Sequence, residues 1–397
     1  MTTKHSIIHA PTSATRTLAS LLLCCLLSLP MLHCSSQSST QLPSAAACDH
    51  EQLRRDIGEM LLVGFRGLTA DDTSHIIRDI HQHHIGGVLL FEYDAPSHSR
   101  PRNISSPTQL QHLCRQLQTA DSTPLFIAID QEGGRVNRLK SQYGFPPFAS
   151  AKAMARGGAD SVKHYARLTA HTLHTLGINL NFAPCVDVDV NPDCPIIGRI
   201  ERSFSADAER VAQCAAWWIE AHHEEGVVCC LKHFPGHGSS LADTHLGLAD
   251  VSDTWQEHEL IPYRRLIAAG KADMVMTTHV YNALLDSLQP ATLSRRTLTD
   301  LLRDSLGFDG VVITDDMAMG AMTQHYTLRD MLLGAIEAGA DMLCLSNNGD
   351  QYDPDIVPHT IDLIVALVDE GRLAPQRIAQ SAQRIRTLKE TQLHPSR

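Results

Sequence analysis

Eight short hydrophobic segments recur along most of the chain, and they are the most regular feature of its pattern. They are rich in valine, isoleucine, leucine and methionine, and their apolar residues follow one another instead of alternating with polar ones. Strands that are buried on both faces of a parallel sheet have this pattern. The sequence therefore predicts eight buried strands, at residues 60–65, 86–91, 125–130, 178–188, 227–234, 274–280, 310–316 and 341–346.

Segments with apolar residues three or four positions apart lie between these strands, for example at 159–177, 209–226 and 328–340. This spacing predicts amphipathic helices. Eight strands that alternate with helices are typical of an α/β fold of the (β/α)8 type, the TIM barrel. The stretch after the last predicted strand is long enough for closing helices and too short for a second domain. We therefore expect one barrel domain over residues 51–397.

The first residues have a different pattern. Lys4 and Arg16 precede a hydrophobic run at 18–32, which is short for a membrane span and typical of an export signal. Residues 1–33 are predicted to be a signal peptide and residues 34–50 a flexible tether. Cys34 is followed by two serines, as at a lipid attachment site, although His33 stands where such a site usually has a small residue. We expect an exported protein of the periplasm or cell envelope, which meets a membrane only through a lipid anchor at Cys34.

Charge and cysteine usage exclude several classes of protein. The formal net charge is −11 without a basic cluster, so nucleic acid is not an expected partner. The eleven cysteines contain no CxxC pair, and those in predicted strands, such as Cys185 and Cys344, are interpreted as buried thiols. No cofactor is expected, and the composition leaves the oligomeric state open.

Two patterns resemble metal sites and fail on inspection. Residues 186–193, VDVDVNPD, are spaced like a calcium loop, but Pro192 and Gly198 replace the glycine and glutamate that the loop requires. Turn formation explains these residues better. The histidines at 81–84 and 222–223 fall at predicted helix ends, where solvated side chains are expected. We predict no metal site.

Polar residues gather where the predicted strands end. Catalytic residues of a TIM barrel lie at the carboxyl ends of its strands, so this concentration favours an active site. Only one of the adjacent Asp315 and Asp316 is expected to face the barrel axis, because side chains alternate along a strand, and the other is expected to turn outward or to cap the turn after the strand. The residues in question are Asp130, Asp187, Asp189, Lys232, His233, His279, Asp315 and Asp316.

Two loops allow more than one interpretation. In IDQEGGRVNRL, residues 129–139, Asp130 with Arg135 and Arg138 suits the binding of sugar hydroxyls, but a buried Asp–Arg bridge that holds the loop is equally consistent. In KHFPGHGSSLADTHLGL, residues 232–248, Asp243 and His245 are spaced like a charge-relay pair. Composition alone leaves a catalytic loop and a solvated connection open for this stretch, and its three histidines also raise the question of a metal site, although none is predicted.

The segments IDQEGGRV, NFAPCVDVDVNP, RSFS, KHFPGHG, ADTH and GFDGVVITDDMAM occur in this order. Together they resemble glycoside hydrolase family 3, and most of all its single-domain bacterial β-N-acetylglucosaminidase (β-N-acetylhexosaminidase) branch, which includes enzymes of peptidoglycan recycling. The resemblance extends over residues 57–346.

The resemblance implies roles for eight residues. Asp315 matches the nucleophile, and His245, oriented by Asp243, matches the acid/base. The residues that match those holding N-acetylglucosamine are Asp130, Arg138, Arg202, Lys232 and His233. One departure concerns Arg202, because IGRIERSFS has three residues between IG and RSF where the family usually has one. The SFS that comes next favours Arg202 over Arg199 for this role.

The resemblance implies a retaining, exo-acting β-N-acetylhexosaminidase that removes terminal N-acetylglucosamine from peptidoglycan fragments or chitooligosaccharides through a covalent glycosyl-enzyme. The alternatives are a β-glucosidase or a phosphorylase on the same barrel, and a non-catalytic sugar-binding protein of the envelope. Phosphorolysis is considered because an imidazole acid/base does not repel phosphate as a carboxylate would.

Overall fold

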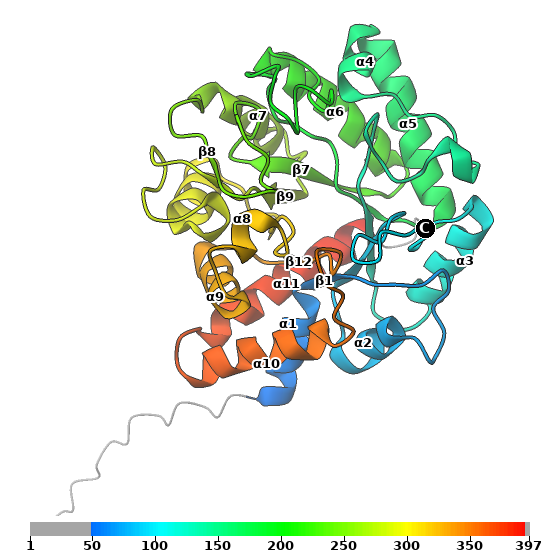
Figure 1. Cartoon of the computed structure of the whole chain (residues 1–397), viewed down its shortest axis with the longest axis vertical. Coiled ribbons are helices and arrows are strands. Elements are labelled where there is room, and N and C mark those ends of the chain that lie inside the picture. The colour runs from blue at the N-terminus through cyan, green and yellow to red at the C-terminus, as the bar shows by residue number, and fades with distance from the viewer. Residues whose placement is uncertain (1–48, 394–397) are drawn as a thin grey trace, which may run out of the picture. The chain divides into compact units, whose positions relative to one another are not determined.

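The structure is a computed structural model that describes residues 49–393. Its centre is an eight-stranded parallel sheet in which each strand pairs with its neighbour in the order of a barrel. Helices surround these strands, as Figure 1 shows. The barrel strands are β1 (Leu61–Gly64), β2 (Gly87–Leu90), β3 (Phe126–Ile129), β6 (Leu180–Asn181), β7 (Val228–Phe234), β9 (Met274–Thr277), β11 (Val311–Ile313) and β12 (Leu343–Leu345).

The barrel closes between its first and last strands. β1 pairs with β12, and the seam between β11 and β12 is made by Met342, whose N–H donates to the carbonyl of Val312 (2.9 Å) and whose carbonyl accepts from Thr314 (3.1 Å). The predicted (β/α)8 barrel is therefore confirmed, and each predicted strand segment supplies one strand of it.

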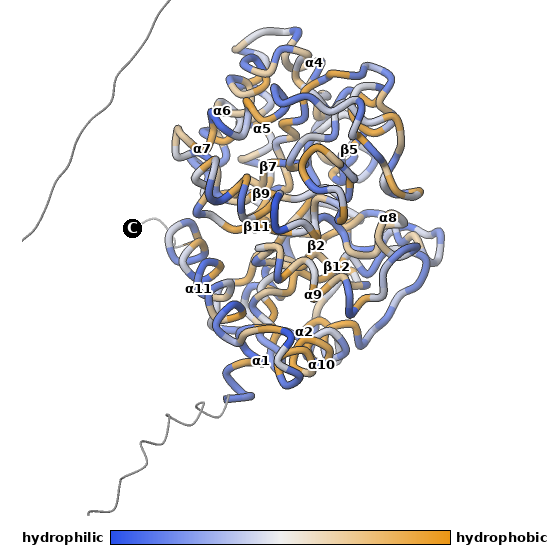
Figure 2. The backbone as a smooth tube through the Cα atoms, turned by 90° about the vertical axis from the view of Figure 1, so that its left-hand side faces the viewer, coloured by the Kyte–Doolittle hydropathy of each residue, from blue (hydrophilic) through white to orange (hydrophobic). Residues whose placement is uncertain are grey.

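All eight strands are buried along their whole length, and hydrophobic segments run through the middle of the molecule while the outer helices alternate in hydropathy (Figure 2). The helices that cover or close the barrel are α1 (His50–Glu59), α2 (His75–His83), α3 (Pro107–Gln118), α4 (Ala151–Arg156), α5 (Gly158–Leu176), α6 (Ala208–Glu224), α7 (Ile261–Ala268), α8 (Gly320–Thr323), α9 (Leu328–Ala338), α10 (Ile356–Asp369) and α11 (Pro375–Gln392). The remaining helical segments are the short 3₁₀ turns η1 (Ser141–Tyr143), η2 (Glu257–Leu260) and η3 (Ala291–Leu293), and the ten-residue π-helix η4 (Arg296–Ser305).

Local sequence signals explain where the helices begin and end. The side chain of Ser106 accepts from the N–H of Gln109 to cap α3, which begins with proline, and Asp207 caps α6 in the same way. α5 ends at Gly177, which adopts φ 81°, a left-handed conformation that glycine tolerates best. No helix of the described chain combines the length and the apolar character that crossing a membrane requires.

One strand is much shorter than the sequence predicts. The hydrophobic pattern predicts a single strand over residues 178–188, but β6 contains only Leu180 and Asn181. Pro184 lacks an N–H and interrupts the ladder, and the chain rejoins β7 through a bridge between Cys185 and Lys232. This break leaves Asp187 and Asp189 on a loop above the barrel.

Two small sheets lie outside the barrel. β4 (Gln131–Gly133) pairs with β5 (Val136–Asn137) directly after β3, and β8 (Ala249–Asp250) pairs with β10 (Val280–Tyr281). The second pair fixes the chain immediately after residues 235–248, the long loop that comes after β7 and that we call the β7 loop.

Candidate active site

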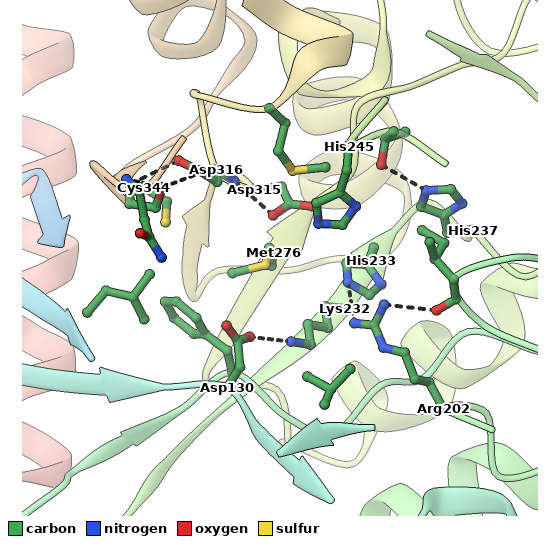
Figure 3. Close-up of a pocket in the computed structure, with 18 of the residues that line it drawn as sticks. Asp130, Arg202, Lys232, His233, His237, His245, Met276, Asp315, Asp316 and Cys344 are labelled. Atoms are coloured by element: carbon green, nitrogen blue, oxygen red, sulfur yellow. Dashed lines mark hydrogen bonds and ion pairs between the residues drawn. The ribbon is translucent and has the colours of Figure 1, made fainter. Parts of the chain in front are cut away.

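A cavity of about 480 Å³ opens at the carboxyl ends of the strands. All eight residues that the resemblance singled out line it, although they come from five separate strand ends and loops, and all but Arg138 and Asp243 are labelled in Figure 3. These residues are Asp130, Arg138, Arg202, Lys232, His233, Asp243, His245 and Asp315. A barrel brings its strand ends together, which is why residues far apart in sequence meet here.

Asp315 and Asp316 lie directly after β11 and have different surroundings. Burial acts to raise the pKa of Asp315, but the nearby imidazoles of His279, His233 and His245 hold that pKa below its ordinary value. Asp315 is therefore a carboxylate at neutral pH. Burial raises the pKa of Asp316.

Asp316 accepts hydrogen bonds from the residue that follows the neighbouring strand β12. It accepts from the hydroxyl and N–H of Ser346 (2.5 and 2.9 Å) and from the N–H of Ala318 (3.2 Å). The expected cap on the turn after the strand is confirmed, but Asp316 also lines the cavity, so the alternative that it turns outward is wrong.

The β7 loop carries Asp243 and His245 to the cavity. Nδ1 of His245 lies 2.7 Å from Oδ1 of Asp243, which also accepts the N–H of His245 (2.9 Å). This hydrogen bond is the main reason that the pKa of His245 is raised. The imidazole points toward Asp315 (Figure 3), and its Nε2 is the nitrogen left for another partner.

A buried group of charges forms the floor opposite this loop. Nζ of Lys232 lies 2.7 Å from Asp130 and 2.7 Å from Glu132, and Asp130 also accepts from Arg138 (3.1 Å). Burial acts to raise the pKa values of Asp130 and Glu132, but the adjacent cations hold both pKa values well below their usual range. Asp130 therefore makes the Asp–Arg bridge of one sequence interpretation, and because it also lines the cavity, its binding of sugar hydroxyls stays a prediction.

Arg202 and His233 are joined to each other. Arg202 makes a two-pronged bridge to Glu132 (2.9 and 2.8 Å) and donates to Nε2 of His233 (3.0 Å). Because a guanidinium only donates, Nε2 of His233 accepts, and its Nδ1 carries the proton that is donated to Asp187 (2.6 Å). Arg202 is buried, whereas Arg199 is exposed and does not line the cavity.

The longer segment of residues 199–201 also reaches the site. Ile200 lines the cavity, and Glu201, at φ 60°, accepts a hydrogen bond from Ser150 (2.7 Å). The extra residues are thus fixed against the start of α4 and add an apolar side chain to the rim.

Three residues without a role in the sequence interpretation belong to the framework of the site, and of these only Asp187 had been expected near it, as a polar residue at a strand end. Glu132 lies behind Arg202 and Lys232, Asp187 anchors His233, and buried His237 lines the cavity. A signal for Glu132 existed, because residues two apart on an extended chain face the same side and Asp130 precedes it by two. The sequence indicates a strand end and a turn at Asp187 but not its histidine partner, which lies on another strand.

One group in the described chain has donor atoms close enough for a metal ion: Cys185, Asp187 and His233. Their atoms already bond to one another, since both the thiol of Cys185 (3.2 Å) and the imidazole of His233 donate to Asp187. Burial raises the pKa of Cys185 well above its usual value, so the residue remains a thiol. These groups are satisfied without an ion.

The expectation for the histidines at helix ends needs a correction at one position. His222, at the end of α6, is completely buried, stacks on Trp218 and bonds to Asn181 (3.1 Å). Burial lowers its pKa to about 3, so it is a neutral core residue and not a solvated one.

The sequence profile described as the N terminal domain of glycosyl hydrolase family 3 matches residues 52–388. This chain belongs to glycoside hydrolase family 3. It is a glycosidase, and members of the family are similar to it in both sequence and fold.

Among curated proteins, the β-hexosaminidase of Tolumonas auensis is 37% identical over 268 residues, which is 66% of this chain and 76% of that protein. The β-hexosaminidase of Pseudomonas aeruginosa is 34% identical over 293 residues, or 73% of this chain and 82% of that protein.

Solved structures of the family superimpose on the barrel. A family 3 β-N-acetylglucosaminidase from Paenibacillus sp. has a TM-score of 0.77 at 34% identity, and the match covers 87% of this chain and 64% of that one. A β-N-acetylhexosaminidase from Beutenbergia cavernae has a TM-score of 0.74 at 30% identity, with 85% and 98% covered.

Proposed function

We propose that this glycosidase is a retaining, exo-acting β-N-acetylhexosaminidase. The observation that carries the proposal is the arrangement of an ionised Asp315 facing the Asp243–His245 pair in one cavity. The relatives named above are β-hexosaminidases and β-N-acetylglucosaminidases, which favours this activity over that of a β-glucosidase.

In the first step Asp315 attacks the anomeric carbon, and the bond from that carbon to the leaving oxygen breaks. The leaving oxygen takes the proton from Nε2 of His245, because Nδ1 is committed to Asp243. In the second step the same nitrogen removes a proton from water, which attacks the anomeric carbon and releases Asp315. Asp243 keeps the proton on Nδ1 and favours the imidazolium form.

The sugar is held from the opposite side by the charged floor. Asp130, Arg138, Arg202, Lys232 and His233 offer fixed donors and acceptors for hydroxyl and acetamido groups. Because they bond to one another before any sugar arrives, they need little reorganisation when a sugar replaces solvent.

The test compares p-nitrophenyl β-N-acetylglucosaminide with p-nitrophenyl β-glucoside. The protein is expected to cleave the first and to leave the second nearly untouched, and Asp315→Ala is expected to bind N-acetylglucosamine in calorimetry without turning over substrate. Wild-type protein that binds the sugar and cleaves neither compound would instead support the envelope sugar-binding protein.

Two finer points need separate measurements. Product analysis on muropeptides and on chitobiose distinguishes a role in peptidoglycan turnover from one on chitin fragments. Added inorganic phosphate tests phosphorolysis, because a phosphorylase releases sugar 1-phosphate and a hydrolase does not.

We also propose that the protein is exported and lipid-anchored at Cys34. The support is the sequence pattern of residues 1–34, which lie outside the described residues. Labelling with a radioactive fatty acid and cell fractionation test it: Cys34→Ser is expected to lose the label and to leave the membrane fraction while hexosaminidase activity persists.

A further inference from the structure

Thr244 has an unusual position between the two residues of the proposed catalytic pair. It is completely buried, whereas the side chain of His245 beside it is 62% exposed and Asp243 is half-buried. Within residues 241–248, the exposed part of the β7 loop, Thr244 is the only buried residue, so it is the point at which this part is attached to the barrel.

The contacts of Thr244 reach two different elements. Its hydroxyl lies 3.3 Å from Nε2 of His237, and its carbonyl accepts from the N–H of Ala321 in α8 (3.1 Å). α8 belongs to the segment that comes after β11 and Asp315. Thr244 therefore connects the loop that carries His245 to the segment that carries Asp315.

The approach of this loop to α8 is close. A Cβ at Gly320 would lie 2.7 Å from the carbonyl oxygen of His245, so only glycine fits there without a shift of the backbone. Nε2 of Gln324 also donates to the carbonyl of Leu246 (3.1 Å). His245 and the residues on either side of it are thus in contact with α8 and the residue after it at several points.

His237 supplies the other end of this attachment. Its N–H donates to Asp187 (2.8 Å), and its ring packs edge-on against His233, with centroids 6.1 Å apart. Burial lowers the pKa of His237 to about 4, which keeps the ring neutral at working pH. A neutral ring bonded on one side to Thr244 is suited to holding a loop and is not needed as a proton donor.

We infer that His237 and Thr244 are positioning residues, a latch that holds the Asp243–His245 pair over Asp315. The inference rests on the proposed function, because it assumes that His245 is the acid/base. The latch gives His237 a purpose that its place in KHFPGHG alone did not reveal.

Loss of such a latch is expected to affect some substrates more than others. When His245 is displaced, protonation of the leaving group suffers, while attack by Asp315 and sugar binding do not. A poor leaving group such as a sugar alcohol needs the proton, and 2,4-dinitrophenolate does not. Loss of the latch therefore slows the two substrates unequally, whereas general damage to the barrel slows both.

The experiment measures kcat/KM on chitobiose and on 2,4-dinitrophenyl β-N-acetylglucosaminide. Thr244→Val is expected to lower the first at least about tenfold and the second less than about twofold, because small displacements of a catalytic group are costly only in the step that uses it. Its kcat on the dinitrophenyl substrate is expected to rise when azide is added, since azide needs no base. Thr244→Ser, which keeps the hydroxyl, is expected to behave like wild-type protein.

Thr360→Val is the matched control. Thr360 is equally buried, but its hydroxyl bonds only to the carbonyl of Ile356 in α10 (2.7 Å), away from the cavity. It is expected to leave both substrates unchanged. Thermal unfolding of each variant separates a folding defect from displacement of the loop.

A double variant tests whether His237 acts through Thr244. His237→Leu alone is expected to give the same unequal loss, and Thr244→Val/His237→Leu is expected to be no worse than the more impaired single variant. Losses that multiply would show that His237 acts separately, and an equal loss on both substrates in Thr244→Val would overturn the latch. His245→Ala distinguishes failure of the latch from failure of the proposed function. If His245 is the acid/base, this variant shows the unequal loss and the rescue by azide; if it shows neither, His245 is not the acid/base.

Discussion

At the scale of single residues, the floor of the cavity is a set of buried charges that depend on one another. Glu132 is in contact with both Arg202 and Lys232 but does not itself line the cavity. Removing one member of such a group leaves its partners charged and unpaired in a buried place, which costs far more than the pair contributes on a surface. Glu132 therefore controls where two sugar-binding candidates point.

Glu132→Gln removes the charge and keeps the shape. We expect KM for the p-nitrophenyl substrate to rise and kcat/KM to fall by roughly 10- to 100-fold, because Arg202 and Lys232 lose their common anchor. Steady-state kinetics checks this. Glu209→Gln, which breaks the exposed pair with Arg265, is expected to have no effect, and an unchanged KM in Glu132→Gln would contradict the argument.

The Asp243–His245 pair predicts a shift in the pH profile. The first step needs His245 protonated, so kcat/KM falls as pH rises through the pKa of His245, which is raised chiefly by the hydrogen bond that its imidazole donates to Asp243. Asp243→Asn removes the negative charge, so the alkaline limb is expected to move to lower pH, with a lower maximum rate. A pH–rate profile with the limb unmoved would show that Asp243 does not set this pKa.

The eight residues chosen from the sequence meet in one cavity because the carboxyl ends of barrel strands surround the same opening. Their grouping was therefore predictable, and their roles remain predictions. The framework behind them was not predictable. Asp187 is defined by its bonds to His233 and His237, and no spacing in a single strand shows that such a partner exists. His222 was misplaced for a related reason, since the end of a helix can be covered by the rest of the fold.

At the scale of elements, the position of the β7 loop depends on α8, a helix of one turn that no hydrophobic period predicted. The eight strands and the long helices were predictable from periodicity. The short length of β6 was not predictable, because the effect of Pro184 on the ladder depends on which neighbour needs the missing N–H. The short elements beside the cavity thus owe their form to tertiary contacts.

Gly320→Ala tests the contact between this loop and α8. The added methyl group would lie 2.7 Å from the carbonyl of His245, so the loop is expected to shift and kcat/KM on chitobiose to fall about tenfold or more. Gly334→Ala, in α9 and facing only the side chain of Leu293, is the matched control and is expected to be active. If Gly320→Ala were as active as this control, the close contact with α8 would not be needed to position the β7 loop.

At the scale of the whole barrel, helices from the two ends of the described chain hold the fold together. α1 lies before the first strand and α11 after the last, and the two pack against each other. Lys389 of α11 and Glu59 of α1 form a buried ion pair at 2.5 Å, and Lys389 also lies over the ring of Phe126 in β3. Arg377 and Arg384 of the same helix reach the buried Asp341, which precedes β12 at the barrel seam.

Lys389→Met leaves Glu59 charged and unpaired in the interior. Breaking such a pair costs about 3–5 kcal/mol, which for a domain of this size lowers the thermal midpoint by on the order of 10 °C. Replacing both partners, in Glu59→Gln/Lys389→Met, is expected to recover most of the loss, because no buried charge then remains. Calorimetry of the three proteins checks this, with kcat measured well below the midpoints and expected to be equal, since neither residue lines the cavity. A single variant as stable as the wild-type protein would show that α11 does not close the barrel through this pair.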